Sequence, residues 1–496
     1  MSGLYQRIAA QAARRPDALA LESDHRRLSF RALVDLTDAT ADRFQHEGLG
    51  AGAAIGWLGH NSAEMLAALL ACARLGAMFV PLNWRLAAPE LAAIARHAGL
   101  SAMRHTPEMA GLAAQVLDGA PLAGRRRAAP GLPPVPALPD PAAADLLLVY
   151  TSGTTGEPKG ALHTQAGMLA NIDIALAVQG LTADDRVLAV LPLFHVGGLC
   201  IQVLPALAVG AAVHLHARFD PAAWLRDVAV WRPSTSLLVP TLMQALLTHP
   251  GWPAADLASL RFVNSGSQTV PVGLIHGFHA RGVPVAQVYG STESGPFSIA
   301  LRPEEALARV GSTGRPAPGV GLRLADPAGA EVAPGEVGEI LLQAPNLMRG
   351  YHRRPAGAGF ERGWFATGDL ARADSEGFVT VVGRSRDLII SGGENILPAE
   401  IESLAATWPG VAEAVVLGLP DPHWGEVPVL VLVAQPGALP DLPALQAHLA
   451  QRLARYKQPR RTVVVDTLPR TALGKVRKSV LRQLLIDGAA ARTPAA

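Results

Sequence analysis

The sequence predicts an α/β protein of two or more domains, and three observations lead to this prediction. Strand-like and helix-like segments alternate through residues 16–140, the pattern of a mainly parallel sheet with helices on its faces. The chain has 496 residues, more than one hydrophobic core normally serves. Hydrophobic residues make up 49% of it and charged residues 17%, which favours a well-buried globular enzyme over a disordered chain.

The first elements can be assigned in order. Residues 55–58 are expected to form a strand, Asn61 and Ser62 to cap a helix that runs through Cys72, and residues 77–80 to form the next strand. Residues 121–141 are rich in proline and arginine with little apolar periodicity, so we interpret them as a surface connection.

A long segment between Arg186 and Arg218 contains no Lys, Arg, Asp or Glu, and it is long enough to span a bilayer. Prolines and glycines interrupt it, however, and it divides better into a strand (187–191), a bent helix (199–209) and a strand (212–216). A buried strand–helix–strand unit is therefore the favoured interpretation.

Bulk charge and cysteine content exclude several classes of function. The formal net charge of +2 implies no general affinity for nucleic acid or anionic membrane. Cys72 and Cys200 are the only cysteines and both have apolar neighbours, so neither a disulfide framework nor a cysteine metal site is expected. The N-terminal residues lack the apolar core of a secretory signal, and a cytoplasmic location is the default expectation.

The most informative segment is Tyr150–Gly160, which follows a short apolar run of strand character. Its glycines let backbone N–H groups converge on an anion, and its hydroxyls and lysine add donors and charge. It is not the usual nucleotide P-loop, because Lys159 stands between a proline and a glycine. We interpret it as a phosphate-binding loop rather than a polar surface turn, with the binding residues Thr151, Ser152, Gly153, Thr154, Thr155, Gly156 and Lys159.

This loop resembles the signature loop of the adenylate-forming enzymes, which include acyl- and aryl-CoA synthetases, adenylation domains and beetle luciferases. Other motifs of that family follow in the expected order. His195, in Leu191–Gly198, falls where a strand ends and a helix is about to start, and the resemblance implies that it borders the carboxylate pocket as a substrate gate. Gly266 and Ser267 follow the expected strand 261–265 and would line adenine and the acyl group, although Gln268 departs from the family pattern.

The segment Tyr289–Ser294 resembles the family motif Tyr-Gly-x-Thr-Glu. An aromatic ring can stack on adenine, a threonine hydroxyl can hold phosphate, and a carboxylate can bind Mg²⁺. The resemblance therefore assigns nucleotide binding to Tyr289, Gly290 and Ser291, catalysis to Thr292, and both catalysis and Mg²⁺ binding to Glu293. Asp369, in a further motif, would hold the ribose hydroxyls.

The resemblance also implies the domain organisation. Residues 1–384 would form the large N-terminal domain of sheets flanked by helices, with the ATP and acyl pocket, and Arg384 would reach the nucleotide. Residues 385–387 would be the hinge, where Arg386 replaces the usual Asp or Lys. Residues 388–496 would form a small, mobile α+β domain that carries a catalytic lysine.

Several residues of the small domain resemble family positions that bind CoA. Gly392 and Gly393 allow close backbone approach for the pantetheine arm, and Trp424 lies in a segment typical of acid–CoA ligases. Ten basic residues and one acid lie between Arg452 and Arg482. This can be a solvated face or a patch for CoA phosphates, with Lys457 and Arg460 as the best candidates. Lys475, in the terminal motif, would bridge carboxylate and phosphate.

The helical spacing of Leu445, Leu449, Leu453 and Tyr456 predicts a core face within the same domain.

The function implied is an ATP-dependent carboxylic acid–CoA ligase that works through an acyl-adenylate, with ATP, Mg²⁺ and CoA. The expected pocket wall favours an apolar fatty or aromatic acid, because it is mostly small or apolar: His195, Gly198, Leu199, Ser265, Gly290 and Pro296. The alternatives are a stand-alone adenylation enzyme that loads a carrier protein, and a non-catalytic nucleotide-binding protein. Small molecules are the expected partners, with no nucleic acid and no integral membrane segment, and a homodimer is left open.

Overall fold

The computed structural model describes residues 3–23, 26–122, 141–151, 158–355, 357–470 and 476–488. The chain divides into two compact units. The first comprises residues 1–270, 274–322 and 342–366, and the second comprises residues 271–273, 323–341 and 367–496. Residues 385–387 form one turn of 3₁₀ helix. The domain boundary at residue 384 and the hinge itself stay predictions.

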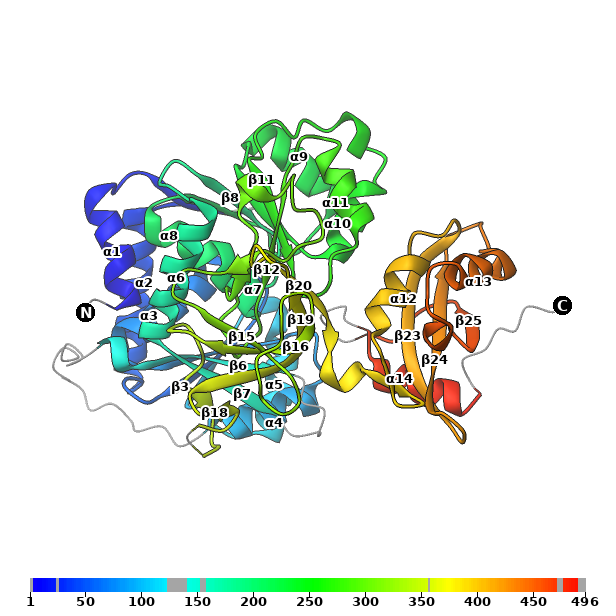
Figure 1. Ribbon diagram of the computed structural model, residues 1–496. Coiled ribbons are helices and arrows are strands. Elements are labelled where there is room, and N and C mark those ends of the chain that lie inside the picture. The colour runs from blue at the N-terminus through cyan, green and yellow to red at the C-terminus, as the bar shows by residue number, and fades with distance from the viewer. Residues whose placement is uncertain are drawn as a thin grey trace. The chain divides into compact units, whose positions relative to one another are not determined.

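Among the described residues, the first unit contains a nine-stranded sheet with the order β14-β13-β12-β11-β10-β8-β9-β1-β2 (Figure 1). Its strands are β1 (Leu19–Ser23), β2 (Arg26–Ser29), β8 (Arg186–Ala189), β9 (Ala212–Leu215), β10 (Thr235–Leu238), β11 (Phe262–Gly266), β12 (Val285–Tyr289), β13 (Ile299–Ala300) and β14 (Arg315–Pro316). The run from β12 to β1 is parallel throughout. The carboxyl ends of these strands therefore lie along one edge of the sheet, where ligand sites form in α/β proteins.

A second sheet has six strands in the described part of the chain, with the order β17-β7-β6-β4-β3-β5. They are β3 (Ala54–Leu58), β4 (Met78–Leu82), β5 (Ala102–His105), β6 (Asp145–Thr151), β7 (Lys159–Thr164) and β17 (Gly350–Tyr351). Strands β6 and β7 pair antiparallel, and β17 pairs antiparallel with β7. Residues near 350 thus lie beside the strand that carries Lys159.

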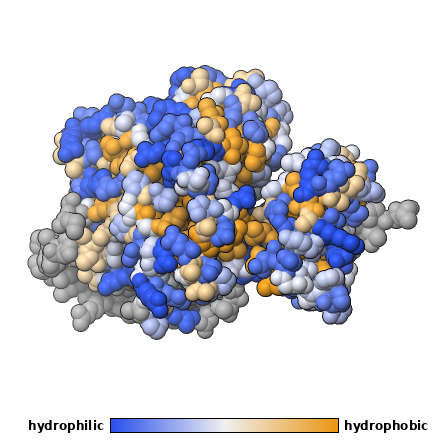
Figure 2. Space-filling view, in the orientation of Figure 1, coloured by the Kyte–Doolittle hydropathy of each residue, from blue (hydrophilic) through white to orange (hydrophobic). Residues whose placement is uncertain are grey.

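Helices pack against both sheets, and one helix is buried in a core that strands of both sheets share. The helices of the first unit are α1 (Leu4–Arg14), α2 (Phe30–His46), α3 (Ala63–Leu75), α4 (Ala88–Ala98), α5 (Ala110–Gly119), α6 (Gln165–Gln179), α7 (Val196–Gly198), α8 (Leu204–Val209), α9 (Pro221–Trp231), α10 (Pro240–Leu247) and α11 (Val272–His279). Helix α3 is buried along its whole length except at Glu64 and Arg74, and it packs in a core shared with β1, β3, β6 and β8. The free thiols of Cys72 and Cys200 lie in this core. Figure 2 shows mainly hydrophilic residues over α1, and an ion pair between Arg7 and Asp173 joins α1 to α6.

The predicted first elements are confirmed, including the helix cap. The hydroxyl of Ser62 accepts a hydrogen bond from the backbone N–H of Met65 (3.2 Å) at the start of α3. The predicted strand–helix–strand unit is also confirmed, since β8 and β9 pair in parallel around the helical stretch. That stretch contains a π-helical turn at Leu199–Val203 before α8. No helix in the described ranges combines the length and apolar character that a bilayer crossing requires.

The rest of the chain forms two smaller sheets. One has the order β15-β16-β19-β18 with β20 on β19, from β15 (Gly321–Ala325), β16 (Val337–Gln343), β18 (Phe360–Glu361), β19 (Trp364–Ala373) and β20 (Val379–Arg384). The other has the order β22-β21-β24-β23 with β25 on β24, from β21 (Ile389–Ser391), β22 (Glu394–Ile396), β23 (Val411–Asp421), β24 (Gly425–Ala434) and β25 (Arg461–Val465). The helices α12 (Pro398–Ala405), α13 (Leu442–Ala450) and α14 (Lys478–Ile486) complete it. The α/β class with an α+β C-terminal part is thus confirmed.

One predicted core position is wrong. Leu445, Leu449 and Leu453 are buried, but Tyr456 is 39% exposed. Helix α13 ends at Ala450, so helical spacing no longer decides which side chains face the core six residues later.

Candidate active site

Three of the predicted motifs meet at one edge of the nine-stranded sheet. Gly266 ends β11 and Ser267 follows it, and Tyr289 ends the parallel neighbour β12, where Gly266 pairs with Val288. The segment with His195 follows β8, another parallel strand of the same sheet. Because parallel strands end on the same side, these residues lie along the edge where α/β sheets usually bind ligands.

Two positions at this edge require glycine, because neighbouring backbone atoms leave no room for a Cβ. A Cβ on Gly266 would stand 2.1 Å from the carbonyl oxygen of Val288, and a Cβ on Gly290 would stand 2.5 Å from the carbonyl group of Pro296. Ser267 adopts a positive φ of 75°, which is rare for a residue with a side chain. These two positions therefore require glycine so that the adjoining backbone segments can pack closely.

The residue pair Thr292–Glu293 is held by two side chains from elsewhere in the chain. His163 on β7 donates through Nε2 to the carbonyl oxygen of Thr292 (2.8 Å). Burial lowers the pKa of His163 to about 4, so its ring is neutral near pH 7. Tyr351 on β17 donates its hydroxyl to Glu293 Oε1 (3.1 Å). Burial, together with the carboxylate of Glu293, raises the pKa of Tyr351 and keeps the phenol protonated.

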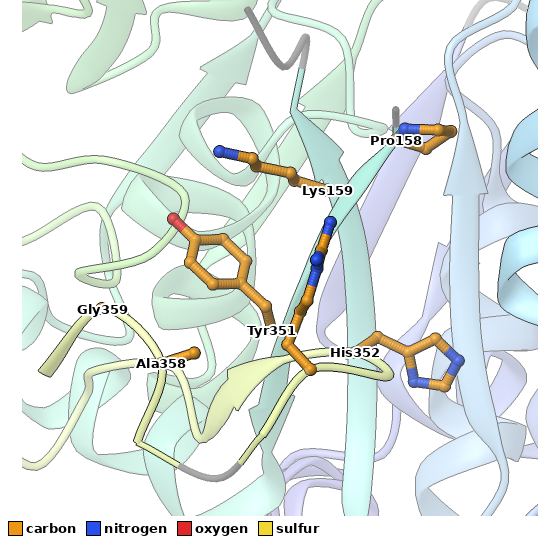
Figure 3. Close-up of a pocket in the computed structure, with 7 residues that line it drawn as sticks. Pro158, Lys159, Tyr351, His352, Ala358 and Gly359 are labelled. Carbon is orange, nitrogen blue, oxygen red and sulfur yellow. The ribbon is translucent and has the colours of Figure 1, made fainter. Parts of the chain in front are cut away.

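Lys159 opens onto a cavity of about 280 Å³ beside Tyr351. In Figure 3 the Lys159 amine and the Tyr351 hydroxyl extend to the same side of β7, whereas the His352 ring turns to the other side. The remaining lining residues are Pro158, Arg354, Ala358 and Gly359. The cationic lining of this cavity suits an anionic group such as phosphate.

The phosphate-binding loop itself is described only at its two ends. Thr151 ends β6 and is the cross-strand partner of Lys159, with its hydroxyl 3.5 Å from the Lys159 carbonyl oxygen. The other predicted loop residues and the predicted catalytic lysine lie outside the described residues; these are Ser152, Gly153, Thr154, Thr155, Gly156 and Lys475.

The oxygen donors at this edge fit a hard divalent cation and a nucleotide. Glu293 presents a carboxylate, Thr292 a hydroxyl, and Ser291 a hydroxyl that accepts from the backbone N–H of Ser294 (3.1 Å). Such oxygen ligands are those that Mg²⁺ prefers, usually with water and substrate phosphate completing its coordination.

His195 is half-buried at the start of α7, and its Nδ1 accepts from the backbone N–H of Gly197 (3.2 Å). The segment before it is clamped by Asn61, whose side chain donates to the carbonyl oxygens of Leu191 (2.9 Å) and His216 (3.0 Å). The same side chain accepts from the N–H of Leu193 (2.8 Å). The sequence suggested only a capping role for Asn61, and nothing local indicates this longer-range clamp.

Two further residues were missed by sequence reasoning. His163 occurs in the short strand segment Lys159–Thr164, and Tyr351 lies in the basic segment Arg349–Arg354; neither residue belongs to a motif identified in the sequence. Their partners lie 129 and 58 residues away, so only the pairing of β7 with its neighbours reveals them.

In the second unit, Asp369 and Arg384 are brought together. They face each other across β19 and β20, and Arg384 Nε lies 3.0 Å from Asp369 Oδ1. The Asp369 side chain is only 11% exposed, whereas that of Arg384 is 44% exposed. This arrangement leaves the guanidinium accessible while it orients the carboxylate expected to hold ribose.

The predicted CoA-binding residues separate into two places. Gly392 donates its N–H to the Trp424 carbonyl oxygen (2.8 Å), and a Cβ on Gly392 would stand 2.7 Å from the Trp424 ring. Arg460 lies over the same ring at 5.6 Å, and Gly393 completes the exposed turn with a φ of 87°. Lys457 instead forms an ion pair with Glu400 (2.7 Å).

The buried His163 makes the stability of the protein depend on pH. The pKa of His163 is about 4 in the fold and about 6.5 in an unfolded chain, so the unfolded state takes up the proton first as pH falls. The free energy of unfolding should fall by up to about 3 kcal/mol between pH 6.5 and pH 4. Urea unfolding across this range should show a shallower decline for His163→Gln, which keeps an N–H donor but cannot titrate. The exposed His46→Gln is the control, and an unchanged slope in His163→Gln would contradict the assignment.

Comparison with known proteins agrees with this geometry. Residues 8–352 match the AMP-binding enzyme family, and residues 400–475 match the C-terminal domain of AMP-binding enzymes. The chain is 42% identical to an indoleacetate–CoA ligase of Aromatoleum aromaticum, over 95% of this chain and 96% of that protein. It is 40% identical to a feruloyl-CoA synthase of Amycolatopsis sp., over 94% and 96%.

A solved structure of similar fold is an anthranilate CoA ligase in complex with anthranoyl-AMP. It has a TM-score of 0.89 and 26% identity, and the match covers 99% of this chain and 97% of that one. The matched segments span both units and most of the chain. The protein belongs to the AMP-binding enzyme family, in its acyl- and aryl-CoA synthetase branch.

Proposed function

We propose that this protein is an ATP-dependent carboxylic acid–CoA ligase that forms an acyl-adenylate and transfers the acyl group to CoA. The main support for this proposal is the hydrogen bond from Tyr351 on β17 to the carboxylate of Glu293. Strand β17 pairs with β7, which carries Lys159, so Glu293 and Lys159 are linked through paired strands. A metal-binding carboxylate and a phosphate-binding lysine on one rigid frame suit the activation of a nucleotide phosphate.

In the first step, an oxygen of the substrate carboxylate attacks the α-phosphate of ATP and pyrophosphate leaves. Negative charge accumulates on the phosphate, and Thr292 and Lys159 supply a hydroxyl donor and a positive charge beside it. When bound at Glu293, Mg²⁺ would neutralise part of the phosphate charge. The buried N–H of His163 holds the backbone of Thr292, so its hydroxyl needs no reorganisation during the reaction.

In the second step, the thiol of CoA loses its proton and attacks the carbonyl carbon of the mixed anhydride, and AMP leaves. Gly392 and Trp424 would hold the pantetheine arm, and Arg460 would meet a CoA phosphate. This role is supported by the tight contact between Gly392 and the Trp424 ring, on which Arg460 stacks. Lys457 is directed to Glu400 and is the weaker of the two phosphate candidates.

We further propose that the acid is apolar, with aromatic acids favoured over fatty acids. Phe194 packs edge-on against Trp84 (6.4 Å between ring centroids) beside the segment that ends in His195. Two relatives, at 42% and 40% identity over at least 94% of this chain, carry the names of indoleacetate and ferulate, both of which contain aromatic rings. A cytoplasmic location and a homodimer stay predictions.

The test is AMP formation from ATP across a panel of carboxylic acids, each with and without CoA. We expect AMP release that requires both an aromatic or fatty acid and CoA. Acid-dependent pyrophosphate exchange without a CoA product would instead indicate a carrier protein as acceptor. ATP binding with no turnover on any acid would indicate a non-catalytic nucleotide-binding protein and overturn the proposal.

A further inference from the structure

Glu293 is tied to a short segment of the chain at both its backbone and its side chain. Its carbonyl oxygen accepts from the N–H of Met348 (2.8 Å), and its carboxylate accepts from the hydroxyl of Tyr351 (3.1 Å). Glu293 is therefore fixed against residues 348–351 at two points, of which one is its carboxylate. Within the described part of the chain the phenol engages Oε1 and no hydrogen bond reaches Oε2, so the lone pairs of Oε2 can bind a cation.

Residues 348–351 are in turn fixed to β7. Tyr351 pairs with Ala161 and Gly350 pairs with Leu162 in the antiparallel register of β17 and β7. Backbone hydrogen bonds extend this pairing on both sides, from Arg349 N to Leu162 O (2.7 Å) and from His352 N to Gly160 O (2.8 Å). Tyr351 thus connects the carboxylate to the strand that begins with Lys159.

The Tyr351 side chain is well placed for this connection. Its ring packs against a small apolar cluster that includes Ala161, Met348 and Phe365, while its hydroxyl extends toward the side of the cavity where Lys159 lies (Figure 3). The ring is fixed by packing and the hydroxyl by its hydrogen bond, so the phenol has one position relative to β7. A metal ligand oriented by such a partner typically loses tenfold to a hundredfold in metal affinity when the partner is removed.

We propose that Tyr351 is a positioning residue that holds the Glu293 carboxylate for the divalent cation of the metal–nucleotide complex. This inference rests on the proposed function, in which Glu293 binds Mg²⁺. The expected consequence is that loss of the phenol hydroxyl weakens the cation and leaves the nucleotide-binding backbone and the fold intact.

The test uses Tyr351→Phe, which keeps the ring and removes the hydroxyl, with Mn²⁺ as the probe. Binding of Mn²⁺ to the full-length protein, in the presence of an ATP analogue with a non-cleavable α,β bridge, is followed by electron paramagnetic resonance. We expect the dissociation constant of Mn²⁺ to rise about tenfold. The free Mg²⁺ concentration that half-saturates acid-dependent AMP formation should rise by the same factor.

The matched control is Tyr5→Phe. Tyr5 also donates its hydroxyl to a carboxylate, Asp38 Oδ1 (2.7 Å), but it lies on α1, away from the ligand-binding edge. This variant should bind Mn²⁺ like the parent protein. Thermal unfolding of both variants shows whether either substitution acts through stability alone.

Two further variants make the outcome decisive. Glu293→Asp keeps a carboxylate but shortens it beyond the reach of the phenol, so adding Tyr351→Phe to it should change Mn²⁺ affinity less than about twofold. Glu293→Gln should bind Mn²⁺ weakly. If Glu293→Gln binds weakly but Tyr351→Phe binds like Tyr5→Phe, the positioning role is overturned and the proposed function stands. If Glu293→Gln binds Mn²⁺ normally, the metal role of Glu293 in the proposed function is overturned as well.

Discussion

Replacing Lys475 with alanine should reduce acid-dependent pyrophosphate–ATP exchange by roughly 10²–10³-fold, while thioesterification of a supplied acyl-adenylate remains close to that of the parent protein. The physical reason is that adenylation passes through a pentacoordinate α-phosphate that carries additional negative charge, which the lysine ammonium would stabilise. In the second step the bond between the acyl carbon and the AMP oxygen breaks while phosphorus keeps its four oxygen ligands, so the same ammonium would contribute less. Lys475 lies outside the described residues, and the expectation depends on its motif, residues 468–476.

The control for this variant is Arg477→Ala, which removes a positive charge two residues away. Arg477 is exposed, and its backbone N–H donates to the Pro469 carbonyl oxygen (2.7 Å), a bond that the substitution preserves. Both half-reactions should stay within about twofold of the parent values. Equal loss of both half-reactions in Lys475→Ala would contradict a role restricted to adenylation.

Replacing Gly266 with alanine should destabilise the first unit by about 3 kcal/mol and also reduce adenylation. The new Cβ would stand 2.1 Å from the Val288 carbonyl oxygen, a backbone atom that can move only if the pairing of β11 with β12 is disturbed. Tyr289 ends β12 and the Thr292–Glu293 pair follows it, so the disturbance would reach residues that are predicted to contact the nucleotide. Urea unfolding and pyrophosphate exchange measure the two effects.

The control for Gly266→Ala is the variant Gly273→Ala. Gly273 lies in helix α11, and no atom lies within 4 Å of the position its Cβ would take. Alanine is favoured over glycine inside a helix, so this variant should be more stable by about 0.5–1 kcal/mol. A Gly266→Ala protein as stable as the parent would show that the β11–β12 contact is less tight than the structure indicates.

Local signals explain why much of the fold was predictable. Alternating apolar segments defined the strands around residues 55–80, and a serine before an apolar helix defined the cap at Ser62. Placement of polar motifs after strands was sufficient to bring Gly266, Tyr289 and the His195 segment to one edge, because parallel strands share the direction of their carboxyl ends.

The connections between these motifs were not predictable, because they depend on strand register. Tyr351 reaches Glu293 only through the pairing of a two-residue strand with β7. Charge patterns were also ambiguous, since a run of basic residues does not reveal that Lys457 has Glu400 as its partner. The wrong assignment of Tyr456 had a simpler cause, which is that a helical period was extended past the end of the helix.

The two cysteines have a consequence for the sulfur chemistry of the protein. Burial shields both thiols from solvent and raises the pKa of Cys72 and Cys200, so each stays in its unreactive protonated form while the core is closed. Oxidants and alkylating reagents act on thiolates, and they gain access only when the core that contains both thiols opens. Modification of these cysteines is therefore coupled to opening of the core, and the closed protein can operate beside a thiol substrate such as CoA without forming mixed disulfides with it.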